Sequence, residues 1–271
     1  MENVSLNFHE TFKPENQYIS VILEMIDEIQ GKTSPEISYI TGIPTGKSSG
    51  KVKPHLYYDK MMGLIDFKKL DAKSPILLTN LGRVVTQEDL GMYEDLTILL
   101  CHCMMLRRKG ARLWSFIFRE IFPKYNGSIS FDLLLKELEE PFGGKVTRKG
   151  LAPFIGTYTD FAAQLSLLEV NKDLITVSPM RINPEFIFLY GYILLEYWDE
   201  IFADRDEITS DELKDLHFRD AFCWNDIQEY ECLEQLSEKG VIRLNRQLSP
   251  FTILRVQKKK DIVDKLYSEL L

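Results

Sequence analysis

The sequence predicts a mostly α-helical protein that contains several winged helix-turn-helix units, each with a small β-hairpin as its wing. Apolar residues recur at helical spacing through most of the 271-residue chain. At residues 63–65, 167–169 and 240–242, a helix ends in small or apolar residues and two short strand-like runs follow. A helix that leads into a hairpin is the outline of a winged helix. We therefore expect up to three such units, joined by helical segments.

The same pattern divides the chain into five segments. We expect an N-terminal winged-helix DNA-binding unit over residues 1–90 and a helical connector over 91–125. A second winged-helix-like unit follows at 126–182, and a connecting helix at 183–206. Residues 207–271 form a third winged-helix-like unit together with a C-terminal helix. Each of the three units falls within the usual size range of small domains.

The first unit begins with a helix over residues 14–30, where apolar side chains recur every three or four positions. Ser34, Pro35 and Glu36 open a second helix, with the proline in its first turn. The stretch 37–65 then holds an apolar segment, a turn rich in Gly, Ser and Pro, and a lysine-bearing helix. A charged hairpin completes the expected unit.

The turn in this stretch resembles the end of a phosphate-binding P-loop, because Gly46, Lys47 and Ser48 are consecutive. A P-loop also needs a glycine five positions before the glycine of Gly-Lys-Ser, and that position is Thr41. Pro44 removes one backbone N–H from the bend that would surround the phosphates. The sequence therefore argues against a nucleotide-hydrolysing P-loop enzyme.

The start of the lysine-bearing helix predicts a contact with DNA phosphates. A serine hydroxyl at this point can cap the helix, and a helix N-terminus favours anions. Lysines clustered there suit phosphate oxygens. The alternative is an ordinary cap on a solvated helix face, and the DNA interpretation requires ammonium groups that are exposed and not paired with carboxylates. The expected DNA-binding residues are Lys47, Ser48, Ser49, Lys51, Lys53, His55 and Lys60.

The connector predicts two buried helices, over residues 94–105 and 112–122. The first is apolar on nearly every side, so it should be central. Cys101, His102 and Cys103 lie inside it, but three consecutive residues cannot point in one direction from a helix. We therefore expect these three side chains to pack in the core rather than to form a metal site.

The second and third units repeat the first in outline. The second has helices over residues 130–139 and 151–165, and the third has helices over 212–216 and 224–239, each pair followed by a hairpin. The helix at 185–198 is apolar and aromatic. It should pack between units or form an oligomer contact, so a homodimer is one expected state.

The amino-acid composition limits which classes of function are possible. A hydrophobic content of 45% is ordinary for a folded globular protein. The net charge of −8 argues against polyanion binding by the whole surface, so DNA would be met by local basic patches or inside a larger complex. The chain has no signal-peptide pattern and no apolar run of ~18 residues, which argues against a membrane span. Four cysteines without a C-x-x-C pair suit a reducing cytoplasm.

Several collinear motifs in the first part of the chain carry a family resemblance. They include residues 9–12 (His-Glu-Thr-Phe), the lysine-bearing turn and helix, residues 78–82, and residues 93–102. Together they resemble an uncharacterised-domain family of bacterial and archaeal proteins. Its members are similar to components of Ssp-type DNA phosphorothioation defence clusters, where one is described as a DNA-nicking partner of the sulfur-inserting enzymes. The resemblance implies double-stranded DNA, sulfur-transfer proteins and ATPases as partners.

A nicking activity would need catalytic groups, and His9 with Glu10 are the best local candidates. A histidine can act as a base, and a glutamate can bind Mg²⁺ or Mn²⁺ or orient the histidine. Adjacent residues point to opposite sides of an extended chain, so the pair needs a bend to act together. The alternative is structural: Glu10 caps the helix after Pro14, and His9 hydrogen-bonds a backbone carbonyl.

The sequence thus favours a DNA-binding component of a bacterial phosphorothioation modification or defence system, with strand nicking to assist sulfur insertion as an implied further activity. The second hypothesis is a non-catalytic winged-helix adaptor or transcription regulator that docks protein partners. An acidic net charge of −8 suits a partner that is basic or already on DNA.

Overall fold

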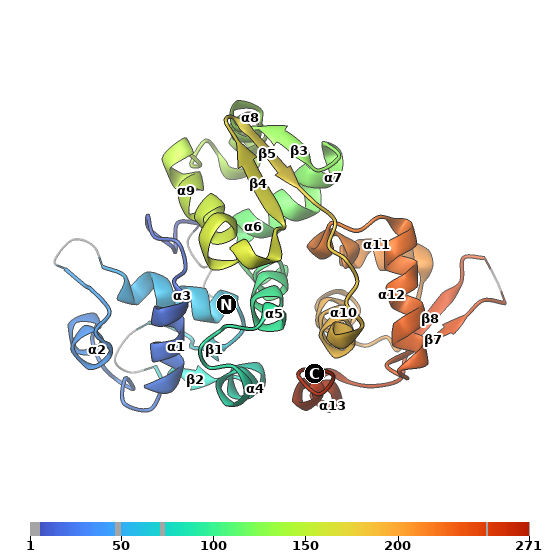
Figure 1. Ribbon diagram of the computed structural model, residues 1–271, viewed down its shortest axis with the longest axis horizontal. Helices are drawn as coiled ribbons and strands as arrows, with labels where there is room; N and C mark the ends of the chain where they lie inside the picture. The colour runs from blue at the N-terminus through green and yellow to red at the C-terminus, as the bar shows by residue number, and fades with distance from the viewer. Residues whose placement is uncertain (1–5, 47–49, 71–73, 248, 271) are drawn as a thin grey trace.

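The computed structural model describes residues 6–46, 50–70, 74–247 and 249–270. Its helices and strands form three groups around a central helix, α5 (Asp95–Met105), as Figure 1 shows. The mostly helical fold with small antiparallel sheets that the sequence predicts is confirmed. No helix within these ranges is long and apolar enough to cross a membrane.

The first group comprises helices α1 to α4 and the antiparallel pair β1–β2, at the lower left of Figure 1. Helix α2 starts after Thr33, whose backbone N–H donates to the Glu36 carboxylate at 2.7 Å. It ends at Gly42, whose φ of 73° a glycine adopts without strain. The bounds are α1 (Asn16–Glu24), α2 (Ser34–Thr41), α3 (Val52–Met61), β1 (Ile65–Asp66), β2 (Leu77–Leu78) and α4 (Asn80–Glu88).

Two helices of this group differ from the sequence-based prediction. Helix α1 ends at Glu24, and turns replace its predicted last part. Residues 80–82 begin α4, a helix that the sequence-based prediction does not include. The Thr79 hydroxyl caps this helix by accepting a hydrogen bond from the Gly82 N–H at 2.9 Å. The cap and the buried spacing of Leu81 and Val85 show that α4 was readable from the sequence and was missed.

The connector consists of α5 and a long helical segment whose middle part is a π-helix. Every residue of α5 from Leu96 to Met105 is buried, which confirms the predicted central helix. In the next segment, Phe122 donates its backbone N–H to Ile117, five residues back, and Pro123 has no N–H to offer. The bounds are α6 (Arg112–Phe116), the π-helix η1 (Ile117–Ile121) and α7 (Phe122–Lys124).

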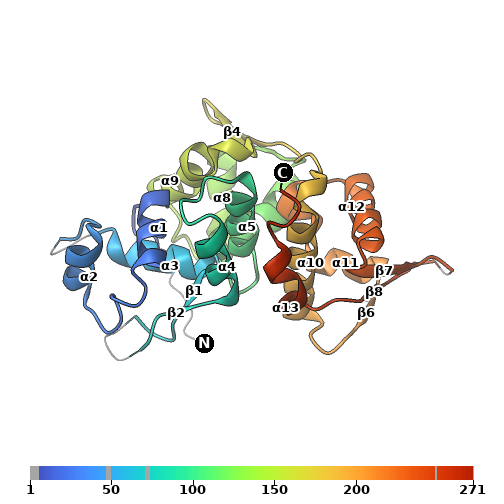
Figure 2. The ribbon, with the colours of Figure 1, turned by 60° about the horizontal axis from the view of Figure 1, so that its bottom comes forward.

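The second and third groups share one topology. In each, a short strand precedes two helices and then pairs with the second strand of a hairpin, giving the sheet orders β3-β5-β4 and β6-β8-β7. The central pairs are buried isoleucines: Ile129 faces Ile175, and Ile208 faces Ile253. The β7–β8 hairpin extends away from the body of the molecule (Figure 1 and Figure 2).

These two groups contain the following elements. The second group has β3 (Ser128–Ser130), α8 (Phe131–Phe142), α9 (Arg148–Gly156), the π-helix η2 (Thr157–Phe161), η3 (Ala163–Leu165), β4 (Leu168–Asn171) and β5 (Leu174–Val177). The third has η4 (Pro184–Phe186), α10 (Ile187–Ile201), β6 (Glu207–Thr209), α11 (Ser210–Leu216), η5 (Arg219–Phe222), α12 (Asp226–Glu238), β7 (Ile242–Asn245), β8 (Thr252–Arg255), α13 (Lys259–Ile262) and η6 (Val263–Lys265).

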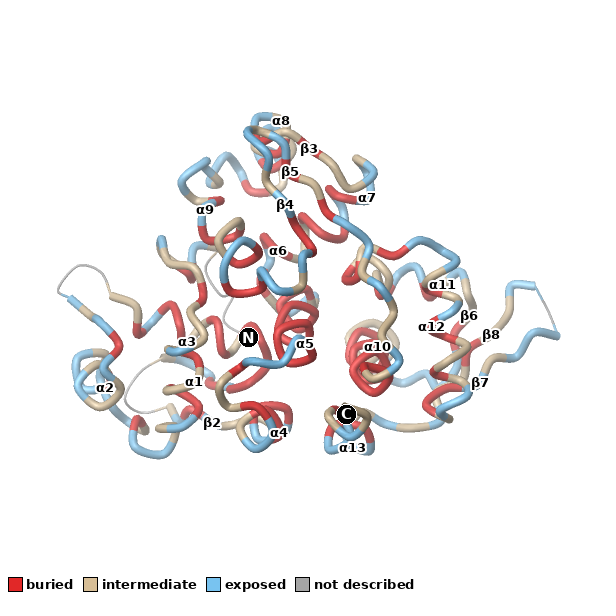
Figure 3. The backbone as a smooth tube through the Cα atoms, viewed as in Figure 1, coloured by how far each residue is buried: buried red, intermediate tan, exposed pale blue. Residues whose placement is uncertain are grey.

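A buried histidine of α5 joins the groups. His102 accepts a hydrogen bond from the Tyr158 hydroxyl at Nδ1 (2.8 Å), and its Nε2–H donates to the Ala221 carbonyl (2.8 Å). Tyr158 belongs to the second group and Ala221 to the third. Figure 3 shows α5 and α10 as continuously buried segments at the centre. The predicted core role of His102 is confirmed.

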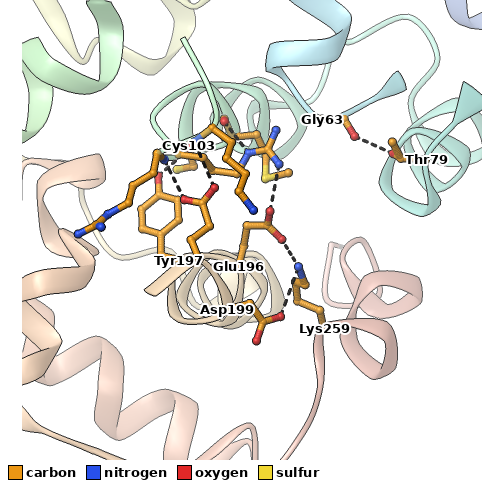
Figure 4. A network of polar contacts seen from close by, with 12 residues as sticks. Gly63, Thr79, Cys103, Glu196, Tyr197, Asp199 and Lys259 are labelled. Carbon is orange, nitrogen blue, oxygen red and sulfur yellow. Dashed lines mark hydrogen bonds and ion pairs between the residues drawn. The ribbon is translucent and has the colours of Figure 1, made fainter. Parts of the chain in front are cut away.

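A second junction is ionic and lies between α5, α10 and α13. The buried Glu196 carboxylate is 3.0 Å from the Arg107 guanidinium and also pairs with Lys259 (Figure 4). Arg107 further donates to the Met61 carbonyl at 3.3 Å, at the end of α3. Glu196 therefore links the third group both to the connector and, through Arg107, to the first group.

Candidate nucleic-acid interface at the start of α3

Helix α3 is largely enclosed. It contacts α1, α2 and β1, and on another side its Tyr58 ring lies 6.3 Å from the Trp114 ring of α6. The Tyr58 hydroxyl donates to the Phe12 carbonyl at 2.8 Å. Among the described residues of α3 and its N-cap, Lys53 is exposed, and Lys51, Tyr57 and Lys60 are half-buried. The buried residues of α3 are Val52, Pro54, His55, Leu56, Tyr58, Asp59 and Met61.

The N-cap of α3 is Lys51, which differs from the predicted serine cap. Lys47, Ser48 and Ser49 lie outside the described residues, so the structure does not place these three expected contacts. Pro54 sits in the first turn, where its missing N–H leaves no helical hydrogen bond unmade.

The lysines of the predicted patch are not all free. Lys51 Nζ is 2.7 Å from the Glu15 carboxylate, and this hydrogen bond raises the pKa of Lys51. Lys60 Nζ is 2.8 Å from Asp66 and lies over the Phe67 ring. Lys53 is exposed and has no ion-pair partner within the described ranges. The requirement for unpaired ammonium groups is thus met by Lys53, and not by Lys51 or Lys60.

His55 belongs to the core of the first group. Its ring is fully buried against Tyr18, with centroids 5.0 Å apart, and its Nδ1–H donates to the Lys51 carbonyl at 2.7 Å. Burial lowers the pKa of His55 to about 4, so the ring is neutral at pH 7. We therefore leave His55 out of the candidate interface.

His9 is also buried, against the rings of Phe8 and Trp114 at 5.4 and 5.6 Å. Burial lowers its pKa to about 4, and its Nδ1 has no hydrogen-bond partner in the described part of the chain. The neighbouring Glu10 is half-buried, with a positive φ of 54°. The neutral imidazole has the protonation state of a base, but its burial separates it from any strand bound at the surface.

A cavity of about 410 Å³ lies between the first and second groups, and we call it the junction cleft. Clefts of roughly this size at domain boundaries are common ligand sites. The cleft brings the turn after His9 next to Lys51 and α9, which unites the two regions singled out in the sequence. Its lining consists of Thr11, Phe12, Lys13, Glu15, Lys51, Ala152 and Pro153.

Lys13 is the residue of this cleft that sequence reasoning missed. Its ammonium group pairs with Asp160 of η2, far away in the chain. No local pattern could have predicted this pairing, because it depends on how the second group packs on the first. The cleft therefore presents two ammonium groups, Lys13 and Lys51, each held by one carboxylate, beside the Phe12 ring.

A second cavity, of about 190 Å³, lies between the second and third groups. Aromatic side chains such as Phe118 and Trp224 line much of it, and Asp220 is the charged group at its wall. It has no cationic side chain, so it does not suit a phosphate.

Comparison with known proteins places the fold. No family model matches the sequence, and no curated protein matches it. Two solved structures are similar: a crystal structure of SspB, and one described as magnesium-ion-bound SspB. Each aligns with a TM-score of 0.76 at 14% sequence identity, covering 98% of this chain and 88% of the SspB chain. The chain thus has an SspB-like fold, which confirms the predicted resemblance to an Ssp-type component.

One of the two SspB structures is magnesium-ion-bound, so the fit of this chain's own residues to Mg²⁺ matters. Among the described residues, no group of three or more His, Cys, Asp or Glu side chains is arranged to hold a metal ion. Near the junction cleft, Glu15 and Asp160 are already paired with lysines. The described side chains therefore do not fit a resident Mg²⁺ at this site.

Proposed function

We propose that this protein is a DNA-binding component of a bacterial phosphorothioation modification or defence system. The observation that carries the proposal is the similarity of fold to SspB over 98% of this chain. The sequence motifs that suggested an Ssp-type family lie in the first part of the chain, whereas the structural similarity extends over the second and third groups as well. Sulfur-transfer proteins and ATPases of the same system are the proposed partners.

The proposal includes winged-helix units with the five segment boundaries stated above. In the second and third groups, a strand, two helices and a hairpin form a sheet in which the first strand pairs with the last. A helix precedes each set, α6–α7 in one case and α10 in the other. This order of elements supports a winged-helix assignment for both groups. The first group has three helices followed by the hairpin β1–β2.

The proposed phosphate contacts are Lys53 and the two lysines of the junction cleft. Lys53 is exposed, so its ammonium group can contact an anion. Lys13 and Lys51 are held by carboxylates, but their side chains are 40% and 27% exposed. Partly exposed ion pairs contribute only about 0–1 kcal/mol, so exchanging a carboxylate for a phosphate is inexpensive. Three lysines at the start of α3 and at the cleft can thus follow a DNA backbone.

Gel-shift titration of a short duplex at about 100 mM salt tests this proposal. Lys13→Glu combined with Lys53→Glu should weaken binding and lower the slope of log K against log salt by about one for each lost contact. Lys136→Glu combined with Lys172→Glu, at two exposed lysines of α8 and of the β4–β5 turn, is the matched control. Equal affinity of the double variant and the control would remove this surface from the interface.

The second candidate function is a non-catalytic adaptor that docks proteins. The enclosure of α3 and the carboxylate partners of Lys51 and Lys60 favour it. If the purified protein retains no duplex at about 100 mM salt, yet co-purifies with a sulfur-transfer or ATPase partner, the adaptor is the better description. We propose DNA binding without nicking, because the described residues around His9 offer no metal site and no exposed base.

A further inference from the structure

The cavity of about 190 Å³ between the second and third groups has walls built largely from aromatic rings, and we call it the aromatic pocket. Phe118, Phe122 and Trp224 form its inner part, and each of them is at most 5% exposed. Pro123 and Asn126 are exposed and lie at its outer side. The aromatic pocket therefore combines an apolar interior with an opening at the surface.

Asp220 is the acidic residue in the lining of the aromatic pocket, and its side chain is 13% exposed. One carboxylate oxygen, Oδ2, is 2.7 Å from His217 Nδ1. The other, Oδ1, is 3.7 Å from Arg219 Nε, which is beyond hydrogen-bond distance, and it accepts no hydrogen bond from the described residues. Burial raises the pKa of the Cys223 thiol to about 12, so this second lining residue is neutral at pH 7. Asp220 therefore has acceptor capacity left for a ligand.

Negative charge also predominates around Asp220. Arg219 pairs with Asp226, and His217 Nε2 lies 4.0 Å from the Glu120 carboxylate. The carboxylates of this cluster outnumber its arginine and histidine side chains, so an excess of negative charge remains even when the histidine is protonated. Among the described residues, no cationic side chain lines the pocket. The pocket therefore favours a cation over an anion.

The aromatic rings suit a cation as well. The face of a phenyl or indole ring carries partial negative charge and attracts ammonium and guanidinium groups. The Trp224 indole N–H already donates to the Met180 carbonyl at 2.8 Å, so it is not a free donor for an anion. A cavity of about 150 Å³ holds one benzene molecule. The aromatic pocket therefore has room for a body of that size with a small charged head.

We propose that the aromatic pocket binds an organic cation, namely an ammonium or guanidinium group on an apolar body of roughly six carbon atoms. The charged head pairs with Asp220, and the body packs on Phe122 and Trp224. A free amine and a lysine or arginine side chain of a partner protein share this chemistry. The inference goes beyond the proposed DNA contact, because the pocket attracts the charge opposite to that of a phosphate.

Three probes with the same ring and different charges test the proposal: benzylammonium, benzyl alcohol and benzoate. Each is titrated at pH 7 into the ¹⁵N-labelled full-length protein, and the indole N–H signal of Trp224 reports binding. Its loss in Trp224→Phe assigns this signal. Benzylammonium should bind at least about tenfold tighter than benzoate, with benzyl alcohol between them, because the charge at the head differs. This comparison within the wild type does not depend on the folding of any binding variant.

Variants then identify the groups responsible. Asp220→Asn should bring the affinity for benzylammonium to within about twofold of that for benzyl alcohol, because the ion pair is lost. Glu120→Gln removes the same charge at an exposed carboxylate outside the lining, so this matched control should change affinity less than about twofold. Phe122→Leu keeps an apolar wall without the ring and should weaken benzylammonium about threefold more than benzyl alcohol. An unchanged thermal unfolding midpoint shows that the variants are folded.

Several results would overturn the proposal. Equal affinity of the wild type for the three probes would show an apolar pocket that does not select charge, and tighter binding of benzoate would show selection for an anion. An unchanged Trp224 signal at about 10 mM of every probe would mean that the pocket takes up no small molecule. Equal losses in Asp220→Asn and Glu120→Gln would mean that the probe senses only net charge.

The source of the cation is distinguished by comparing butylammonium with lysine whose amino-acid ends are both blocked as amides. Equal affinities would support the proposal with a partner's side chain as the ligand. Binding of the blocked lysine that is at least about tenfold weaker would support it with a free amine, because the pocket then excludes the peptide groups.

Discussion

Asp59 lies in the middle of α3 with its side chain fully buried, and neither carboxylate oxygen has a hydrogen-bond partner in the described structure. Burial raises its pKa well above the ordinary value. The folded protein therefore keeps a proton that the unfolded chain releases above about pH 4, and folding becomes less favourable as the pH rises. A buried carboxyl group without a hydrogen-bond partner destabilises the fold, and Asp59 is such a group.

Replacing Asp59→Asn should raise the free energy of unfolding at pH 7 by more than about 1.4 kcal/mol, the value of one pKa unit. The amide is neutral in both states, so folding no longer requires proton uptake. Urea unfolding followed by circular dichroism measures the effect, and the gain should vanish near pH 4 as both states become protonated. A loss of stability at pH 7 would show that Asp59 has a partner.

Asp89 provides the matched control. Its carboxylate accepts hydrogen bonds from the Tyr93 and Glu94 backbone N–H groups at 2.9 and 3.0 Å, and from the Thr97 hydroxyl at 2.6 Å. Asp89→Asn replaces an acceptor by a donor opposite these groups, so it should destabilise by roughly 1–3 kcal/mol. Replacing aspartate by asparagine should thus raise the free energy of unfolding at Asp59 and lower it at Asp89.

His9 bears on the nicking activity that the family resemblance implies. Its imidazole is 2% exposed and neutral, enclosed by Phe8 and Trp114. If the purified protein converts supercoiled plasmid to open circles with Mg²⁺ or Mn²⁺, His9→Gln should leave the rate unchanged within about twofold, because a buried group cannot reach the strand. If the variant is as stable as the wild type but no longer nicks the plasmid, His9 acts as the base.

At the level of elements, α4 packs so closely on the residue before β1 that one added methyl group would disrupt the contact. A Cβ built on Gly82 would lie 1.9 Å from the Leu64 carbonyl oxygen, an impossible distance. Gly82→Ala should therefore push α4 away from β1 and lower the free energy of unfolding by roughly 1–3 kcal/mol. Thermal unfolding measures the change.

Gly150 in α9 is the control for this substitution. A Cβ there would meet the Thr147 hydroxyl at 3.5 Å, an ordinary contact. Gly150→Ala should raise stability by roughly 0.5–1 kcal/mol, because alanine loses less backbone entropy in a helix. If both variants behaved alike, the close approach of α4 to Leu64 would not be what makes Gly82 necessary.

The sequence predicted most helices and every hairpin, since periodic apolar spacing and turn residues are local signals. It missed β3 and β6, each three residues long and recognisable only through pairing with a distant hairpin strand. The ion pairs of the lysine patch could not be predicted for a related reason. The partners of Lys51 and Lys13, namely Glu15 and Asp160, are brought there by tertiary packing. The sequence shows which residues are charged, but tertiary packing decides which ion-pair partners they have.

For the whole molecule, buried ionisable groups predict sensitivity to acid. Burial lowers the pKa of His9, His55 and His102 to about 4, against 6.5 in the unfolded chain. The unfolded chain thus takes up protons first as the pH falls through 6.5, and each histidine removes up to about 3 kcal/mol by pH 4. Asp59 acts in the opposite direction, so the histidine effect is measured in the Asp59→Asn variant, whose stability to urea should fall from pH 7.5 to 6.0 and again to 5.0.

Replacing one of these histidines should make the free energy of unfolding depend less steeply on pH. His102→Gln removes one titrating group, so the slope between pH 6 and 5 should fall by up to about 1.4 kcal/mol per pH unit, whatever the stability at pH 7.5. An identical slope in the variant and the wild type would mean that His102 is charged in the folded protein.

Glu196 connects the third group with the connector and, through Arg107, with the first group, so its loss should destabilise the whole molecule. Burial alone would raise its pKa, but Arg107 and Lys259 outweigh this and lower it, so the carboxylate stabilises the fold at neutral pH and ceases to do so in strong acid. Glu196→Gln leaves two cations without their shared partner and should cost roughly 3–5 kcal/mol. Asp199→Asn, at a more exposed carboxylate of the same helix, should cost less than about 1 kcal/mol. Thermal unfolding compares the two.

The enclosure of α5 has a consequence for how the chain can be divided. Because this helix is buried from Leu96 to Met105 by neighbours before and after it in sequence, it belongs to no single unit. A truncated chain that keeps α5 but lacks α10 would display a wholly apolar cylinder to water and should aggregate. We therefore expect that the three groups do not fold independently and that the protein melts in one cooperative transition.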